Sequence, residues 1–361
     1  MNKVAGAALI VLLFSVSAKA QNFYEVVDLG VLPGQSFSAA TDINNNGTVI
    51  GTSGNRSFMY RNCSKFDIGS LGGSSTFAED LNDSDVVVGR SQRRDGRMRA
   101  FSFHEGVMRD LGGSLEVEGA TAVSNFWGLG VPVGVESLAN GLAASAVFYF
   151  AGVANPLPKF TVIPPSGTGP AEHVSDINDL LRITGHLRSS GNFVGLVSGT
   201  GLGQWTRVLG IPGMDTNVIP NAINEKGQIV GRSGNGTFHA FLSTNPSMPA
   251  VDLGTLAPGQ QSSANDINQN GWSVGMSDLI AFLHNGTRMI DLNSLLINGS
   301  GWLLTEATAI NDNNQIVGIG IHDGQVRAFL ALPRRFPWLI INTPGCLSPP
   351  IFTRAASEAI R

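Results

Sequence analysis

The segment 91–99 holds the most distinctive cluster of charge in the sequence, because Arg93, Arg94 and Arg97 stand within it. Guanidinium groups form bidentate hydrogen bonds with planar oxyanions, so these three could hold a carboxylate or sulfate of an acidic glycan. They are the candidate ligand-binding residues. The plainer interpretation, which we favour, is an exposed loop whose arginines only keep it solvated.

Two segments, 42–47 and 266–271, carry oxygen-bearing side chains at alternate positions and end in glycine, as the opening of a calcium loop does. A calcium loop has an acidic residue six positions after that glycine, where this chain has Ser53 and Ser277. Asparagines that bond to a turn, followed by a glycine with positive φ, describe a β-hairpin. We therefore predict hairpin turns and no cofactor, with calcium as the alternative.

Other catalytic and metal motifs are missing from the sequence. No pair of its six histidines has the spacing of a zinc helix, and no Gly-x-Ser-x-Gly nucleophile elbow occurs. We therefore assign no catalytic residue. The alternative is an enzyme that acts on an extracellular polysaccharide, a glycosidase or lyase, with Glu118, Glu136 or Glu172 as its carboxylates.

These residues belong to a unit that is repeated along the chain. The unit combines Ala-x-x-Ile-Asn, as in segment 40–44, with Gly-x-Ile-Val-Gly, as in segment 227–231. Seven copies can be counted from their register residues, which are Asn44, Asn82, Ser124, Asn178, Asn224, Asn268 and Asn311. Successive register residues lie 38 to 54 residues apart, the length of a four-stranded propeller blade.

The copies are accompanied by an apolar run such as 239–242 and, in its clearest cases, by an Asp-Leu-Gly run such as 252–254, which makes four β-type segments between turn residues. We therefore predict an all-β fold, a seven-bladed β-propeller. One Asp-Leu-Gly segment, 24–30, precedes the first copy, and the last copy lacks one. The N-terminal strand is thus expected to be the outer strand of the last blade and to close the ring.

The combination of Asp-Leu-Gly, Ala-x-x-Ile-Asn, Gly-x-Ile-Val-Gly and His-Ala-Phe-Leu pieces resembles the extracellular HAF repeat of bacterial exported proteins. The resemblance covers about residues 24–332, and the His-Ala-Phe triplet stands unaltered at His239. The family has no well-defined activity, so the resemblance implies export and a repeat fold and assigns no reaction.

The two ends of the chain differ from the repeats. Residues 1–20 have a basic start, a short apolar run and small residues before Gln21, which predicts a secretory signal peptide and a secreted or periplasmic protein. Residues 21–332 form the predicted propeller, and 333–361 form a tail of uncertain structure. Cys63 and Cys346 are the only cysteines. Two free thiols are the simpler expectation, and one disulfide the alternative.

Composition narrows the possible partners. A net charge of −4 gives no overall attraction for nucleic acid, and no segment after the signal is long and apolar enough to insert into a membrane. With near-equivalent copies and no shared catalytic constellation, we expect a non-catalytic exported binding or scaffold protein. It would be a monomer that presents loops on one face to an acidic glycan or another surface protein.

Overall fold

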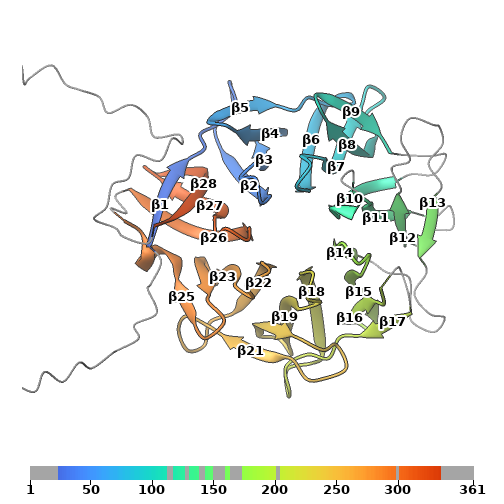
Figure 1. The fold of residues 1–361 in the computed structure, drawn as a ribbon, viewed down its shortest axis with the longest axis vertical. Helices are drawn as coiled ribbons and strands as arrows, with labels where there is room; N and C mark the ends of the chain where they lie inside the picture. Colours follow the sequence, from blue (N-terminus) through green and yellow to red (C-terminus); the bar gives the residue numbers. More distant parts are fainter. Residues whose placement is uncertain are drawn as a thin grey trace, which may run out of the picture.

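The computed structural model describes residues 23–111, 117–126, 130–137, 143–148, 159–162, 173–200, 204–297 and 301–334. These residues form seven four-stranded antiparallel sheets arranged around a central axis, with one strand of each sheet innermost (Figure 1). The prediction of an all-β propeller is therefore confirmed. Within the described ranges, no helix is long and apolar enough to cross a membrane.

The first four sheets follow one another along the chain, and the strands of each run in order from its inner to its outer edge. The first contains β2 (Ser38–Ile43), β3 (Val49–Ser53), β4 (Arg56–Arg61) and β5 (Ser64–Asp67). The second contains β6 (Gly72–Leu81), β7 (Val87–Arg93), β8 (Met98–His104) and β9 (Val107–Asp110). The third contains β10 (Val117–Val123), β11 (Pro132–Ser137), β12 (Ala143–Phe148) and β13 (Lys159–Val162). The fourth contains β14 (His173–Ile177), β15 (Ile183–Ser189), β16 (Asn192–Ser198) and β17 (Trp205–Arg207).

The remaining sheets complete the circle. The fifth contains β18 (Asn217–Ile223), β19 (Ile229–Gly234), β20 (Phe238–Ser243) and β21 (Val251–Gly254). The sixth contains β22 (Ser262–Ile267), β23 (Ser273–Ser277), β24 (Ile280–His284) and β25 (Met289–Asp291), after which comes a 3₁₀ turn, η2 (Leu292–Leu295). The seventh contains β26 (Trp302–Ile310), β27 (Ile316–His322), β28 (Gln325–Arg334) and, as its outer strand, β1 (Phe23–Asp28).

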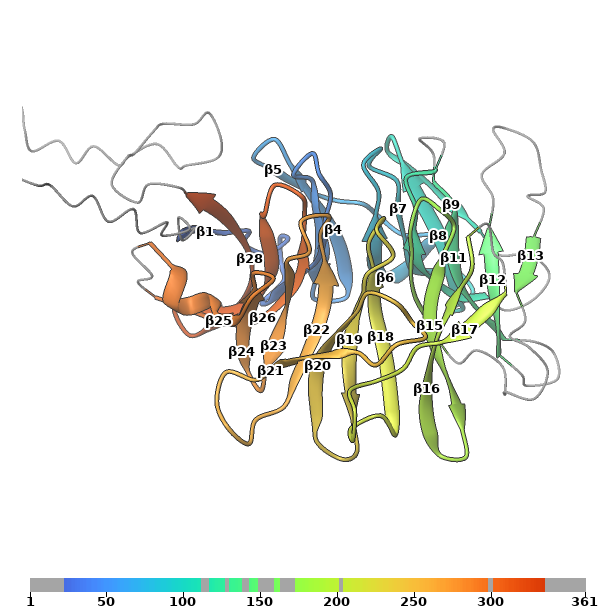
Figure 2. The same ribbon diagram turned by 60° about the horizontal axis from the view of Figure 1, so that its bottom comes forward.

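The N-terminal strand β1 pairs antiparallel with β28, with Phe23 opposite Arg334 and Asp28 opposite Phe329. The Arg334 guanidinium also pairs with Glu25 at 2.7 Å. On its other side β1 meets the residue after η2, where the Ile297 N–H donates to the Tyr24 carbonyl at 2.8 Å (Figure 2). Strand β28 thus runs to Arg334, two residues past the predicted end of the propeller at 332.

The glycine of each Gly-x-Ile-Val-Gly piece lies where its sheet has a β-bulge. In all seven sheets the inner strand gains one residue at the same place, as between Pro220 and Ala222 opposite Gly231. A Cβ on Gly231 would lie 2.1 Å from the Ile219 carbonyl oxygen, and the other six glycines meet a carbonyl equally closely. The bulge therefore requires glycine on the facing strand.

The phenylalanine of the Ala-Phe pieces covers this glycine from the third strand. Phe241 is opposite Gly231, Phe282 is opposite Gly275, and both rings are fully buried. Phe58, Phe101 and Phe329 occupy the same position in their sheets and are also fully buried. These rings pack between neighbouring sheets, and that explains why the triplet recurs.

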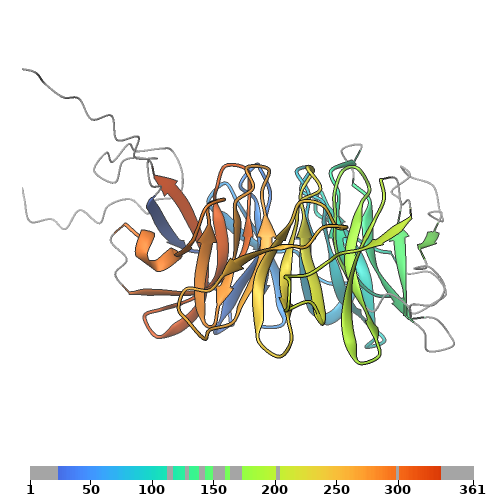
Figure 3. The same cartoon turned by 90° about the horizontal axis from the view of Figure 1, so that it is seen from below.

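The sheets stand side by side with turns at both ends (Figure 3). Because the strands alternate in direction, the first and third turns of every sheet share one end of the ring. We call this end the asparagine face, since the first turns begin at Asn44, Asn82, Asn178, Asn224, Asn268 and Asn311. The second turns and the crossings between sheets lie at the other end, which we call the opposite face.

The two chain ends predicted from sequence, residues 1–20 and most of 333–361, lie outside the described residues. Cys63, in the turn between β4 and β5, is disulfide-bonded. The expectation of free thiols is therefore wrong for Cys63. The other cysteine of the sequence, Cys346, lies outside the described residues.

Candidate functional site

The Asn residues of the repeat build the first turns. The Asn268 carboxamide oxygen accepts the N–H groups of Asn270 and Trp272, both at 3.0 Å. Asn44 makes the same two bonds with Asn46 at 3.1 Å and Thr48 at 2.9 Å. The hairpin prediction for segments 42–47 and 266–271 is therefore confirmed, and the Asn oxygens are occupied by the turn backbone.

The amide end of the same side chains joins neighbouring sheets around the axis. In six copies the Nδ2 donates to the backbone carbonyl of the next register residue, at 2.9–3.0 Å. The last of these bonds runs from Asn311 to Asn44, so the series returns to its start. Ser124 keeps the turn bonds through its hydroxyl, at 3.2–3.3 Å, but is too short to reach the next sheet.

Four aspartates, Asp42, Asp80, Asp176 and Asp266, lie at equivalent positions on the inner strands beside these asparagines. The first three of them help to line a cavity of about 160 Å³. Each accepts the N–H of the residue after it, at 2.7–2.8 Å, and the N–H of the equivalent residue in the next sheet, at 2.6–3.0 Å. We call this set the axial aspartates.

Burial raises the pKa of three axial aspartates, Asp80, Asp176 and Asp266, against the effect of their N–H partners. The pKa of Asp176 is raised to about 8 and that of Asp266 to about 7, in both cases mainly by desolvation. Desolvation, the charge of Asp42 and a hydrogen bond with Asp42 raise the pKa of Asp80 well above its usual value.

The raised pKa values predict that the protein loses stability as pH rises. An unfolded aspartate titrates near pH 4, so between about pH 4 and pH 8 the folded state holds more protons than the unfolded state. The free energy of unfolding should then fall with pH by at most about 1.4 kcal/mol per unit for each aspartate, and level off above the folded pKa. Denaturant unfolding of the wild type and of Asp176→Asn between pH 5 and pH 9 measures this. A variant slope as steep as that of the wild type would contradict the assignment.

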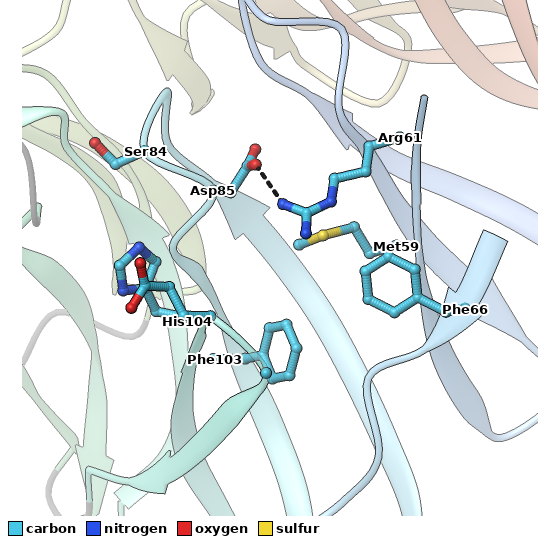
Figure 4. A pocket seen from close by; sticks show the side chains of 9 residues that line it. Met59, Arg61, Phe66, Ser84, Asp85, Phe103 and His104 are labelled. Atoms are coloured by element: carbon cyan, nitrogen blue, oxygen red, sulfur yellow. Dashed lines mark hydrogen bonds and ion pairs between the residues drawn. The ribbon is translucent and has the colours of Figure 1, made fainter. Parts of the chain in front are cut away.

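A larger pocket, of about 580 Å³, opens on the asparagine face between the first and second sheets. Met59, Phe66 and Phe103 give it apolar walls, and Arg61, Asp85, His104 and Glu105 supply its charged or titratable groups. In Figure 4, Arg61 and Phe66 come from one side, and Ser84, Phe103 and His104 from the other. We call this the interblade pocket.

An ion pair spans the interblade pocket and connects it to the axis. Arg61 Nη1 lies 3.1 Å from Asp85 Oδ2, and the other Asp85 oxygen accepts the Asn44 amide at 2.9 Å (Figure 4). The Arg61 guanidinium also lies over the Phe66 ring, 5.8 Å from its centre. With Glu105 at the rim, the pocket holds one guanidinium against two carboxylates. It therefore disfavours an anionic ligand.

The three arginines proposed from the sequence lie elsewhere, on the opposite face, where Arg93 ends β7 and the other two are in the turn between β7 and β8. The Arg93 guanidinium pairs with Asp110 at 2.5 Å. The Arg94 side chain lies over the backbone of Gly72, where an added Cβ would come 2.7 Å from the Arg94 Cγ. The structure thus places the three arginines at one turn and gives Arg93 a carboxylate of the protein itself.

The side chains of the three carboxylates in the enzyme alternative lie outside the part of the chain that the structure describes. Glu118 is in β10 and Glu136 in β11, where only the backbone is described, and Glu172 lies outside the described residues. Among the residues that are described with side chains, no group of three His, Cys, Asp or Glu is placed to hold a metal ion.

The residues of the interblade pocket were missed by the sequence analysis. Arg61 and His104 end the third strands of their sheets, and Asp85 is in a first turn with φ of 59°. None of these positions has the same residue in the other copies, so each looked like ordinary variation of a turn. The one available signal was that two neighbouring copies place charged or titratable residues at the same face.

Neither the comparison with protein-family models nor that with curated proteins finds a match. Solved structures do match, at 9% sequence identity. One is the extracellular domain of a protein named as a one component system from B. thetaiotaomicron, with TM-score 0.55, over 85% of this chain and 40% of that chain. A streptogramin B lyase matches with TM-score 0.53 over 85% of this chain and 97% of that chain. A puromycin hydrolase matches with TM-score 0.53 over 88% and 55%. At this identity the likeness shows the fold alone, a β-propeller.

Proposed function

We propose that this protein is an exported, non-catalytic binding protein. Its fold would be a seven-bladed β-propeller closed by the N-terminal strand. The interblade pocket would hold a neutral saccharide of an extracellular glycan. The observation that carries the proposal is the pocket itself. It has the size of a small-molecule site and combines apolar walls with a few fixed polar groups.

The chemistry of the walls supports a saccharide. The partly exposed Phe66 offers aromatic surface to the C–H face of a sugar ring, and Phe103, which is 6% exposed, contributes to the apolar wall. Arg61 and Asp85 are held in place by their ion pair, and their remaining donors and acceptors can meet hydroxyl groups. The excess of carboxylate over guanidinium favours a neutral ligand over an acidic one.

The fold and the sequence support the rest of the proposal. Seven four-stranded sheets and the pairing of β1 with β28 support a closed ring. The basic and apolar segment 1–20 supports export, as does the resemblance to the HAF repeat. One propeller of similar fold is, by its name, an extracellular domain.

The proposal predicts that Arg61→Gln weakens saccharide binding by roughly tenfold, because a charged hydrogen-bond donor is lost from the pocket. A glycan array of neutral and acidic oligosaccharides would identify ligands, and calorimetry on wild type and variant would give their affinities. The exposed Arg61–Asp85 pair should contribute less than about 1 kcal/mol to stability, so the variant should fold.

Arg56→Gln is the matched control, because Arg56 begins the same strand β4 at the opposite face and pairs with Asp67. It should bind as the wild type does. Failure of every glycan on the array to bind would overturn the proposal, and so would equal affinity of wild type and Arg61→Gln.

The same purified protein tests the competing predictions. Release of reducing ends or unsaturated sugars from any polysaccharide would favour the enzyme. Binding of only acidic glycans, lost in Arg93→Ala with Arg94→Ala, would move the site to the β7–β8 turn. Capture of another surface protein with no glycan bound would favour the scaffold.

A further inference from the structure

Arg232 is a cation that has no counter-charge among the residues that the structure describes. It forms no ion pair with any residue that the structure describes, and its Nε is buried and has no hydrogen-bond acceptor there. The guanidinium lies over the Phe238 ring, 5.3 Å from its centre. Stacking of this kind leaves the edge of the guanidinium free to hydrogen-bond in its plane.

Arg90 occupies the equivalent position in the second sheet and has the carboxylate partner that Arg232 lacks within the described part of the chain. Both residues follow the bulge glycine, in Gly89-Arg90-Ser91 and Gly231-Arg232-Ser233, and both lie over a phenylalanine ring. Arg90, however, pairs with Glu79 at 3.4 Å. In the fifth sheet the position of Glu79 is taken by Asn221, which donates to Ser263 and Ala264 of the next sheet. The two arginines thus occupy the same position of the second strand, but only Arg90 has a carboxylate at the bulge of the inner strand.

Arg232 lines a cavity of about 170 Å³ between the fifth and sixth sheets. Phe238 and Met276 provide its apolar surface, and Gln261 its amide. The two serines of its wall are already hydrogen-bonded to the protein. Asp278 is exposed at the second turn of the sixth sheet, where its carboxylate accepts the Gln261 N–H at 3.1 Å. Arg232 is thus the main group that a ligand could use.

A second arginine, Arg188, lies on the side of Arg232 that faces the fourth sheet. On the side of the fourth sheet, the pKa of His186 is lowered to about 4 by desolvation and by the charges of His173, Arg232 and Arg188. His186 is therefore neutral at physiological pH and Arg188 and Arg232 are the charged groups there. Arg188 is stacked on Phe193, 4.9 Å from the ring centre.

We propose that Arg232 binds the carboxylate of a small organic acid of the size of a uronic acid, in the cavity lined by Phe238, Gln261 and Met276. The two terminal nitrogens of the guanidinium, Nη1 and Nη2, donate hydrogen bonds to the two carboxylate oxygens. Phe238 and Met276 contact the carbon skeleton. This site is separate from the interblade pocket, which lies between other sheets and opens on the asparagine face.

D-glucuronate and D-glucose are the probes, because they differ only in a carboxylate in place of a hydroxymethyl group. Calorimetry on protein that carries Arg61→Gln, which weakens binding in the interblade pocket, should show saturable binding of glucuronate and none of glucose. Arg232→Gln should lower the affinity for glucuronate by about tenfold or more. Arg90→Gln, the matched control, should leave it unchanged.

Asp278→Asn gives a change of opposite sign and keeps the acceptor for the Gln261 N–H. Removing this negative charge from the rim should raise the affinity for glucuronate. The inference is overturned if glucuronate does not bind, if glucose binds equally well, or if Arg232→Gln and Arg90→Gln have equal effects. None of these results bears on binding at Arg61, so the two sites stand or fall independently.

Discussion

Gly231→Ala should destabilise the protein by about 3 kcal/mol or more, because the added methyl group has no space. Its Cβ would lie 2.1 Å from the Ile219 carbonyl oxygen and 2.8 Å from the Pro220 Cα. Both are backbone atoms of the bulge, so relief requires the inner strand to move away from its partner. The free energy of unfolding, from denaturant titration followed by circular dichroism, measures the loss.

Gly119→Ala is the control for the general effect of replacing a strand glycine. An added Cβ there would meet only the Arg90 side chain, at 3.5 Å or more, and its φ is not positive. The change should be close to neutral, because alanine also lowers the entropy of the unfolded chain. Equal stability of the Gly231 and Gly119 variants would show that the bulge tolerates a side chain and that the repeated glycine has another cause.

Asn268→Ala should cost about 3 kcal/mol, because it leaves several buried groups without partners. The side chain is 3% exposed and satisfies the N–H groups of Asn270 and Trp272. It also donates to the Asn311 carbonyl at 3.0 Å, across to the next sheet. Alanine replaces none of these bonds, so the turn and the contact between sheets weaken together. Thermal and denaturant unfolding report the change.

Two further variants separate the turn from the contact between sheets. Asn268→Ser should lose about half as much stability, because Ser124 shows that a serine hydroxyl keeps the turn bonds. Asn270→Ala removes an exposed bond to the Asp312 carbonyl and should cost less than about 1 kcal/mol. Equal losses for Ala and Ser at position 268 would mean that only the bond between sheets matters.

The propeller could be predicted because the information for it is repeated. Each copy contains the residues that its local geometry demands: Asn224 for the first turn, Gly231 opposite the bulge, and Phe241 over that glycine. A pattern that recurs in several copies can be recognised even though the sequence of each copy varies. Segment 24–30 precedes the first copy, and the last copy lacks such a segment. Counting these segments was therefore enough to predict the outer strand of the last sheet.

The candidate sites could not be predicted in the same way, because they depend on positions where the copies differ. Arg61 and Asp85 belong to no repeated motif, and their pairing depends on how the first two sheets pack against each other. Arg93 stood out in the sequence by charge alone, while the proximity of Asp110 came only with the fold. Arg232 is of interest because no carboxylate among the described residues pairs with it. A sequence alone does not show that such a contact is missing.

The bond from Asn311 to Asn44 has a consequence for the order of folding. It joins residues 267 positions apart, and the pairing of β1 with β28 spans the chain from Phe23 to Arg334. Contacts this distant in sequence form late and slow the folding rate. During synthesis, the first strand has no partner until the last one has emerged, so an unfinished chain exposes β1 as an unpaired edge. Completion of the chain is therefore a condition for folding, and a protein truncated before β28 should aggregate.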